Sequence, residues 1–284
     1  MRVAIIGLGL IGGSLGLALK KRNWQKAEVI GYVRQPATGQ VALEMGAIDK
    51  FELSLDKVVE HASIVVISTP VLAIKDIFSQ IAPHLSAGCI VTDTASTKSQ
   101  VMGWARKLLP SSTDFIGGHP MAGKEKFGIE AADSNLFNNS VYCLVRGKQA
   151  TPAAMQTVKT MVEAIGASPL LINARKHDSL IAGISHLPLL LSVALTLSTT
   201  KSYLWPQMSR LASTGYRDLT RLAAGNPEMS TSICLSNQTA IVRWIDEFSR
   251  DLRRLREMVD RGDTEIQSAL TIASEARRKW LEKR

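Results

Sequence analysis

The sequence predicts an α/β domain with a doubly wound, mainly parallel sheet, followed by an all-helical domain. Short apolar runs suited to buried parallel strands alternate with helical patterns over residues 1–150. From residue 151 onward helical patterns dominate. We therefore expect a first domain over residues 1–150 and a helical second domain over residues 151–284.

The chain begins with a strand, a glycine-rich turn and a helix. An apolar run from Val3 to Ile6 leads directly into Gly7-x-Gly9-x-x-Gly12, and a second apolar stretch follows. In a site for a dinucleotide pyrophosphate, Gly7 permits the tight turn, Gly9 lets the backbone approach the phosphates, and Gly12 lets the helix pack on the strand. An ordinary glycine-rich turn is the alternative. The strand before and the helix after favour a Rossmann-type dinucleotide-binding domain.

Further residues are expected to contact the dinucleotide. Leu10 and Ile11 begin the helix, whose free N–H groups and partial positive charge attract the pyrophosphate. Thr69 and Pro70 follow a buried strand predicted at residues 64–67. Ligands of open α/β sheets bind at the carboxyl ends of the strands, so we expect this pair on the nicotinamide side of the crevice.

The end of the second predicted strand bears on the choice of cofactor. A dinucleotide fold usually has an acid there to bind the ribose, but this chain reads Gly31-Tyr-Val-Arg-Gln35. Without the acid a 2′-phosphate is not repelled, and Arg34 can pair with it. We therefore predict NADP. NAD stays possible, with Arg34 as a surface arginine stacked on adenine.

Two polar stretches follow the later predicted strands. Residues 89–92 lead into Asp93-Thr-Ala-Ser96-Thr-Lys98, where Ser96 is a candidate for substrate binding, for capping the next helix, or for both. Phe115-Ile-Gly-Gly-His119-Pro-Met-Ala-Gly123 places His119 on an irregular loop at the presumed carboxyl edge of the sheet, which favours a catalytic role. Residues 140–146 read as an edge strand that closes the first domain.

The second half reads as a succession of helices. An amphipathic helix is expected at residues 152–165 and a short extended piece at 169–172. A long apolar helix follows at 174–197, and others at 202–213, 216–223, 228–260 (broken) and 263–283. His186 and Pro188 interrupt the apolar stretch 180–197, so we expect a helix buried in a helical core rather than a membrane span.

Composition narrows the range of partners. The net charge is +9, but the last segment from Arg243 holds 11 basic and 9 acidic residues, mixed as on a solvated helical face. We therefore expect no nucleic-acid partner, and anionic small molecules instead. Cys89, Cys143 and Cys234 are scattered without metal-ligand spacing, so we expect structural thiols, no metal and a reducing cytoplasm. We expect no leader peptide.

Several motifs together resemble a known family. Gly7-Leu-Gly-Leu-Ile-Gly12, Asp93-x-x-Ser96-x-Lys98 and Gly117-Gly-His119-Pro-Met-Ala-Gly123 stand in the first half. Ile184-Ser-His186-Leu-Pro188, Tyr216-Arg217-Asp218-x-Thr-Arg221 and Gly225-Asn-Pro227 follow. In this order they are similar to the prephenate/arogenate dehydrogenases of tyrosine biosynthesis, over nearly the whole chain.

The resemblance implies a Rossmann domain, a helical domain that forms a homodimer, and the oxidative decarboxylation of a cyclohexadienol with hydride transfer to nicotinamide. By analogy His119 accepts the proton of the ring hydroxyl, or hydrogen-bonds that hydroxyl, as hydride departs, and an ordinary imidazole pKa of about 6.5 is suited to this task. Ser96 corresponds to a residue that hydrogen-bonds the hydroxyl and His119. His186 and Arg217 match substrate-binding positions, and His177 and Asp178 are expected as supporting residues at most.

Some interpretations stay open. The family usually has Thr or Ser where this chain has Lys124, which is a candidate for a substrate carboxylate, a cofactor phosphate or solvent. His186 is otherwise a core histidine, and Arg217 otherwise an ion-pair partner of Asp218. Two rival functions are a β-hydroxyacid-type dehydrogenase, which needs a catalytic lysine on a second-domain helix, and a non-catalytic dinucleotide-binding sensor. Prephenate and arogenate are not distinguished.

Overall fold

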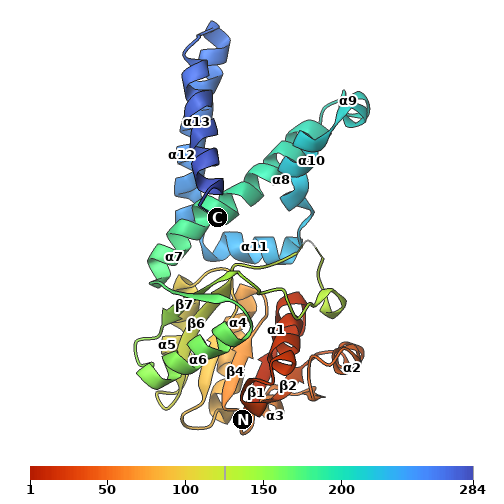
Figure 1. Ribbon diagram of the computed structural model, residues 1–284, viewed down its shortest axis with the longest axis vertical. Coiled ribbons are helices and arrows are strands. Elements are labelled where there is room, and N and C mark those ends of the chain that lie inside the picture. Colours follow the sequence, from red (N-terminus) through yellow and green to blue (C-terminus); the bar gives the residue numbers. More distant parts are fainter. Residues whose placement is uncertain (125, 284) are drawn as a thin grey trace. The chain divides into compact units, whose positions relative to one another are not determined.

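Figure 1 shows the computed structural model, which describes residues 1–124 and 126–283. The chain divides into two compact units, Met1–Gln238 and Thr239–Arg284. The first unit holds the sheet and the helices up to residue 236. The second consists of the helices α12 (Gln238–Arg261, which begins one residue earlier) and α13 (Ile266–Leu281).

The sheet has eight strands in the order β3-β2-β1-β4-β5-β6-β7-β8. Neighbours from β3 to β6 are parallel, β7 runs antiparallel to β6, and β8 runs parallel to β7. The order reverses between β1 and β4, and the carboxyl ends of the strands at such a point form the binding crevice of doubly wound folds. The strands are β1 (Arg2–Ile6), β2 (Glu28–Tyr32), β3 (Lys50–Glu52), β4 (Ile64–Ile67), β5 (Ile90–Asp93), β6 (Asp114–Pro120), β7 (Val141–Arg146) and β8 (Ser168–Leu171).

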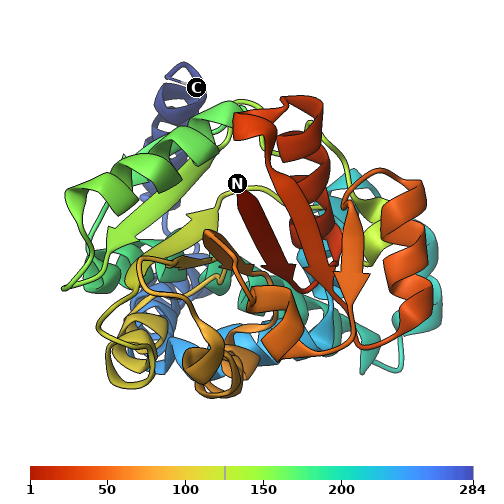
Figure 2. The ribbon, with the colours of Figure 1, turned by 90° about the horizontal axis from the view of Figure 1, so that it is seen from below.

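Helices cover both faces of the sheet, as Figure 2 shows. Side chains of β1 alternate: Val3 and Ile5 pack with α1, α2 and α6, whereas Ala4 and Ile6 pack with α3, α4 and α5. This two-sided burial explains why β1 reads as a continuous apolar run. The helices are α1 (Leu10–Lys21), α2 (Pro36–Glu44), α3 (Leu55–Val59), α4 (Ile74–Ile81), α5 (Ser99–Leu108) and α6 (Pro152–Ala164).

The sheet extends beyond the boundary expected at residue 150. Met155, Val158 and Met161 of α6 are buried in the same core as β1, and β8 pairs with β7 from Val141↔Ser168 to Leu144↔Leu171. The sheet layer therefore ends at Leu171, and β7 is an inner strand rather than the expected edge. The extended piece foreseen at residues 169–172 is the true edge strand, β8.

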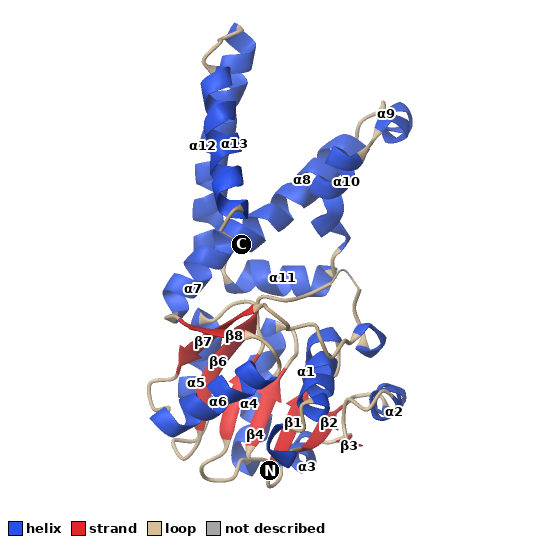
Figure 3. Cartoon of the chain, in the orientation of Figure 1, coloured by secondary structure: helices blue, strands red, loops and turns tan. Residues whose placement is uncertain are grey.

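The chain continues in helices from residue 174, blue in Figure 3. The long apolar helix is formed by α7 (Ala174–Ile181), a π-helical turn (Ala182–His186) and α8 (Leu187–Thr200). Pro188 has no N–H to donate to the preceding turn, which accounts for the local widening of the helix. The next helices are α9 (Trp205–Leu211), α10 (Thr214–Thr220) and α11 (Pro227–Ser236).

The apolar stretch is not buried in a helical core as expected. Ala174–Thr200 is 27 residues long and, by length and composition alone, apolar enough to cross a membrane. Within its most apolar window, 28% of the residues are buried in this chain. Leu187 and Ser192 are the buried residues of α8, while Leu197 is exposed. A single copy of the chain thus leaves much of this helix uncovered.

Candidate active site

The glycine-rich turn has the geometry expected for a phosphate-binding loop. Gly7 has a φ of 101°, and a Cβ there would lie 2.4 Å from the carbonyl oxygen of Ser68. A Cβ on Gly12 would lie 2.0 Å from the carbonyl oxygen of Gly7, so only glycine permits this approach of helix to strand. Around Gly9 a Cβ would meet nothing within 4 Å. The open space at Gly9 is where the backbone can receive a pyrophosphate.

Two cavities meet at this turn. One, of about 600 Å³, is lined by Gly7, Gly9 and Arg34 among others. The second, of about 530 Å³, is lined by Leu10, Ile11, Ser96 and His119 among others. Gly9, Ser68, Thr69 and Pro70 line both. Together they form a continuous crevice at the carboxyl ends of β1, β2, β4, β5 and β6.

All the predicted cofactor residues except Gly12 line this crevice. Gly12 does not line it, but it permits the close packing of α1 on the turn. The hydroxyl oxygen of Thr69 is buried and has no hydrogen-bond partner among the described residues. Such an unpaired buried oxygen is costly, and a bound ligand would satisfy it. Asp76 and Glu228 also line the cavity that holds Arg34, two acidic residues that the sequence analysis did not single out.

His119 lies at the end of β6 with 8% of its surface exposed. Its Nδ1 lies 2.9 Å from Nε2 of His177 on α7, and Nδ1 of His177 lies 2.9 Å from Oδ1 of Asp178. Burial, together with the nearby His177, Lys98 and His186, holds the pKa of His119 well below 6.5. The ring is therefore neutral at neutral pH, which corrects the expected ordinary pKa. His177 and Asp178 are joined to His119 by these contacts and do not line the cavity.

Lys98 is buried completely beneath the site. Its ammonium group pairs with the Asp93 carboxylate and donates to the carbonyl oxygen of Gly118. Burial lowers the pKa of Lys98, and the charge of Asp93 opposes that effect. The first and last residues of the motif from Asp93 to Lys98 are thus paired with each other, and Lys98 also fixes the backbone next to His119. The sequence alone did not reveal this role.

Ser96 lines the cavity beside His119, but it does not have the two contacts expected of it. Among the described residues no hydrogen bond joins Ser96 to His119, whose Nδ1 is taken by His177. Nor does Ser96 cap the next helix, because α5 begins at Ser99. The carboxylate of Asp178 caps it instead, accepting from the backbone N–H groups of Lys98 and Ser99.

His186 lies in the π-helical turn, 1% exposed. Its Nδ1 is 3.3 Å from the side-chain amide of Asn237, and its Nε2 is buried without a partner among the described residues. Burial lowers the pKa of His186 to about 4. Ser185 lines the cavity of His119 but His186 itself does not, so the expected binding role of His186 stays a prediction.

Two predicted substrate-binding cations have different surroundings. Lys124 lines the His119 cavity and pairs with Asp133 at 2.8 Å, and Lys126 lines the same cavity. Arg217 lies on α10 with 76% of its side chain exposed, 3.9 Å from Asp218, and does not line the cavity. In one copy of the chain Arg217 thus forms the local ion pair and lies outside the lining of this cavity, and its role in substrate binding stays a prediction.

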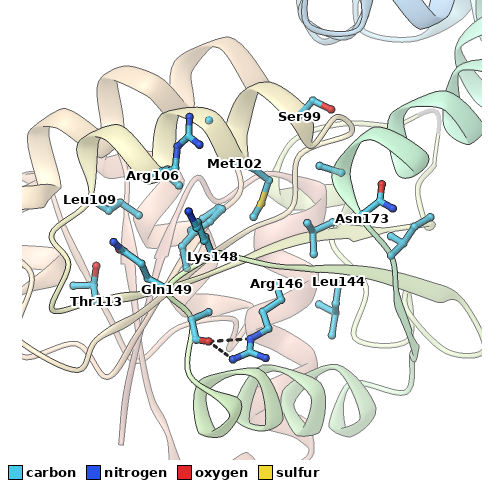
Figure 4. A pocket seen from close by; sticks show the side chains of 18 of the residues that line it. Ser99, Met102, Arg106, Leu109, Thr113, Leu144, Arg146, Lys148, Gln149 and Asn173 are labelled. Atoms are coloured by element: carbon cyan, nitrogen blue, oxygen red, sulfur yellow. Dashed lines mark hydrogen bonds between the residues drawn. The ribbon is translucent and has the colours of Figure 1, made fainter.

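A further cavity, of about 720 Å³, lies beside α5 and is drawn in Figure 4. Met102 and Arg106 line it from α5, and Lys148 and Gln149 from the loop after β7. Arg146 there donates two hydrogen bonds to the carbonyl oxygen of Ala150. None of the glycines of the phosphate loop and no histidine lines this cavity. It is distinct from the crevice at the strand ends.

The phosphate loop, the crevice and the buried neutral histidine define a dinucleotide-dependent oxidoreductase of the Rossmann class. Residues 15–171 match the family model "Prephenate dehydrogenase, nucleotide-binding domain", and residues 173–271 match "Prephenate dehydrogenase, dimerization domain". The two models meet where β8 ends and the helices begin. The chain belongs to the prephenate dehydrogenase family.

Relatives agree along almost the whole chain. Prephenate dehydrogenase of Bacillus subtilis (strain 168) is 35% identical over 265 residues, which is 93% of this chain and 71% of the relative. The crystal structure of Synechocystis arogenate dehydrogenase has 32% identity and a TM-score of 0.83, covering 99% of this chain and 100% of that one. Prephenate dehydrogenase from A. aeolicus, in complex with hydroxyphenyl propionate and NAD+, has 27% identity and a TM-score of 0.91, covering 98% of each chain.

Proposed function

We propose that this protein oxidatively decarboxylates prephenate, arogenate or both, giving 4-hydroxyphenylpyruvate or tyrosine. The observation that carries the proposal is the neutral His119, placed in a cavity that adjoins the phosphate loop. The relatives support it, since their names include prephenate and arogenate dehydrogenases. A non-catalytic sensor would not need a buried base next to the cofactor crevice.

The crevice would hold the dinucleotide along the β1 turn, with the pyrophosphate over Gly9 and the start of α1. Thr69 and Pro70 would border the nicotinamide, because they line both cavities. The nicotinamide, when bound, accepts the hydride that leaves the carbinol carbon of the ring. The side of the crevice lined by His119 and Ser96 then receives the ring itself.

His119 accepts the proton of the ring hydroxyl and later returns it. As hydride leaves the carbinol carbon, the hydroxyl proton passes to the ring nitrogen of His119 and a carbonyl forms. The bond between the ring and the carboxylate then breaks, carbon dioxide leaves, and the electron pair moves through the ring to the carbonyl oxygen. That oxygen takes the proton back and becomes a phenol, so the step neither consumes nor releases a proton overall.

The substrate is an anion, and we place its carboxylates near the cations of the cavity. Lys124 and Lys126 line the cavity, and so does Ser185, the neighbour of His186. We include His186 as a further donor or acceptor because its Nε2 is buried without a partner among the described residues. Binding of a carboxylate by Lys124 would compete with its exposed pair with Asp133, which is a weak interaction. Ser96 lines the same cavity, which supports the proposal that it hydrogen-bonds the ring hydroxyl.

For the cofactor we infer a preference for NADP over NAD. Arg34 lines the cavity that begins at Gly7 and Gly9, at the end of β2 where NAD-binding folds usually have an acid. A guanidinium there can pair with a 2′-phosphate through two parallel hydrogen bonds. The relative from A. aeolicus was crystallised with NAD+, so the preference is a property proposed for this chain.

We also infer that the protein works as a homodimer through its helices. The family model over residues 173–271 is that of a dimerization domain. Exposed apolar side chains occur on α8, such as Leu197, and on α12 and α13, such as Leu252 and Ile272. A second copy that covers these surfaces would remove them from water. The three free cysteines fit the cytoplasm, which we propose as the compartment.

The test is the formation of reduced nicotinamide at 340 nm, measured for prephenate or arogenate against NAD or NADP. We expect activity with at least one ring acid, and faster turnover with NADP than with NAD. No turnover in any of the four combinations, with cofactor binding confirmed by calorimetry, would contradict the proposed reaction. Activity with a β-hydroxyacid in its place would favour the rival class of dehydrogenase.

A further inference from the structure

A chain of three side chains runs from the cavity into the interior. His119 at the end of β6 contacts His177 on α7, and His177 contacts its neighbour Asp178. Both contacts are 2.9 Å long between a nitrogen and its partner atom. The two rings lie 5.1 Å apart between centroids at an angle of 70°. His177 is fully buried, and Asp178 is 4% exposed.

The hydrogen bonds of Asp178 determine which nitrogens carry protons. Its carboxylate accepts from the backbone N–H groups of Lys98 and Ser99. Burial raises the pKa of Asp178, but the hydrogen bonds from His177, Ser99 and Lys98 outweigh that effect and hold it below its usual value. An ionised carboxylate can only accept, so Nδ1 of His177 carries the proton that lies between them.

The same reasoning continues to His119. When the ring of His177 carries a single proton, and that proton is on Nδ1, Nε2 of His177 is the acceptor. Nδ1 of His119 must then carry a proton and donate it to His177. The lone pair of His119 is left on Nε2, the nitrogen that is free to receive a proton from a substrate.

We propose that Asp178 and His177 are positioning residues that keep His119 as the tautomer protonated on Nδ1 and share its positive charge when Nε2 takes the hydroxyl proton. The proposal rests on the proposed function of His119 as the proton acceptor. When the substrate proton binds Nε2, the Nδ1 proton of His119 can move towards His177 and the Nδ1 proton of His177 towards Asp178. The shift reverses when the proton returns to the phenol oxygen.

The surroundings of His119 make this assistance useful. Burial and the charge of Lys98, at the start of α5, oppose a positive charge on the ring of His119. His177 on α7 and His186 in the π-helical turn oppose it only when they are protonated themselves. Lys98 is balanced by Asp93, with which it is paired. Asp178 is then the carboxylate aligned with His119 through a hydrogen-bonded path, and His177 is the connection to it.

A purely structural role is the alternative, because Asp178 also caps α5. His177 contacts the capping carboxylate but makes no hydrogen bond to α5 itself, so its variants leave both bonds from Asp178 to α5 available. His177→Gln offers an acceptor oxygen to Nδ1 of His119 but cannot pass a proton on. His177→Met offers no comparable acceptor and is similar in volume. Lys176→Met, at an exposed position of the same helix, is the matched control.

The experiment is nitrogen-15 NMR of histidine-labelled protein, combined with kcat and KM across pH. The chain has 5 histidines, and His119→Asn identifies the signal of His119. We expect the wild-type ring to be protonated on Nδ1 and the other tautomer to appear in His177→Met. We expect kcat to fall about 10- to 100-fold in His177→Met, less than the ~10²–10⁴-fold of losing the base itself. His177→Gln should keep the tautomer and recover part of kcat.

The outcomes separate this proposal from the proposed reaction. A wild-type His119 protonated on Nε2, or a His177→Met variant with unchanged tautomer and kcat, would overturn the relay. A fall in kcat in Lys176→Met as large as that in His177→Met would also overturn it, since any change on this helix would then have the same effect. The NMR measurement needs no substrate. If the wild type turns over neither ring acid, the reaction fails while the tautomer result still decides the role of His177.

Discussion

Lys98 and Asp93 form an ion pair in which neither side chain is exposed to solvent. Asp93 ends β5 and Lys98 directly precedes α5, and the same ammonium group donates to the carbonyl oxygen of Gly118, directly before His119. A buried charge without its partner is strongly unfavourable, whereas the intact pair is close to neutral for stability. The pair therefore fixes the backbone next to His119, and the loss of either residue would leave the other as a buried, unpaired charge.

Replacing Lys98 by Met should lower the free energy of unfolding by about 3–5 kcal/mol, because Asp93 would be left buried and unpaired. Urea denaturation followed by circular dichroism measures this change. Lys124→Met is the matched control, since it breaks the half-exposed pair with Asp133 and should cost about 0–1 kcal/mol. Equal losses in the two variants would show that burial of the first pair carries no special cost.

Gly9 and Gly12 should respond differently to alanine. In Gly9→Ala the new methyl group meets no protein atom within 4 Å, and φ of −98° is allowed, so stability should stay within about 0.5 kcal/mol. The methyl group would occupy the space of the pyrophosphate, so the Kd for the dinucleotide should rise at least about tenfold. Calorimetric titration checks it; unchanged affinity in Gly9→Ala would contradict the assigned phosphate site.

Gly12→Ala places a Cβ at 2.0 Å from the carbonyl oxygen of Gly7. The helix α1 must then move from β1, at a cost of about 1–3 kcal/mol as for other overpacked interiors. Thermal unfolding of the two glycine variants side by side shows whether the cost falls on Gly12 alone. A Gly12→Ala variant as stable as the wild type would mean that α1 does not depend on this close approach.

Arg34→Asp should reverse the cofactor preference. Loss of a charge-assisted contact to the 2′-phosphate costs about 1.5–3 kcal/mol, so kcat/KM for NADP should fall at least about tenfold. The new acid can accept from the ribose hydroxyls of NAD, and kcat/KM for NAD should rise. Arg22→Asp makes the same charge change at the exposed end of α1 and should alter neither ratio. Wild-type preference for NAD would show that Arg34 does not bind a phosphate.

Local sequence patterns predict the first half of the fold well. The continuous apolar run of β1 and the glycines that follow it depend on neighbouring residues, and the structure has both in the expected order. The end of the sheet could not be placed this way. Whether α6 covers the sheet and β8 extends it depends on the packing of Met155 and Val158 against a core built from distant strands.

The site could be predicted only in part, for the same reason. His119 was recognisable from its glycine-flanked motif, but its partner His177 lies 58 residues away and looked like one polar residue of an apolar helix. The motif position of Lys98 gave no sign of complete burial. Arg217 was placed at the site by motif alone, and in one copy of the chain α10 keeps it in solvent.

Stability should fall in acid partly through His186. Burial lowers its pKa in the folded state to about 4, whereas the unfolded chain titrates near 6.5. The unfolded state therefore binds more protons between these values, and stability present above pH 6.5 is lost as pH falls. For His186 the loss from pH 7 to pH 5 is about 2 kcal/mol.

Urea denaturation of the wild type and of His186→Gln at pH 7 and pH 5 measures the part of the loss of stability that is due to His186. The variant should lose less stability on acidification than the wild type does. His84→Gln, at an exposed position, should behave as the wild type. An identical loss in His186→Gln and wild type would mean that His186 titrates normally in the folded protein.

The most direct test of the account is turnover and cofactor binding in His119→Asn, measured with the ring acid and dinucleotide that the wild type prefers. Loss of a general base predicts a fall in kcat of about 10²–10⁴-fold. Because His119 lines the ring side of the crevice, the Kd for the dinucleotide should stay within about twofold of the wild type. A variant that keeps more than a tenth of wild-type kcat would contradict the role of His119 as the proton acceptor.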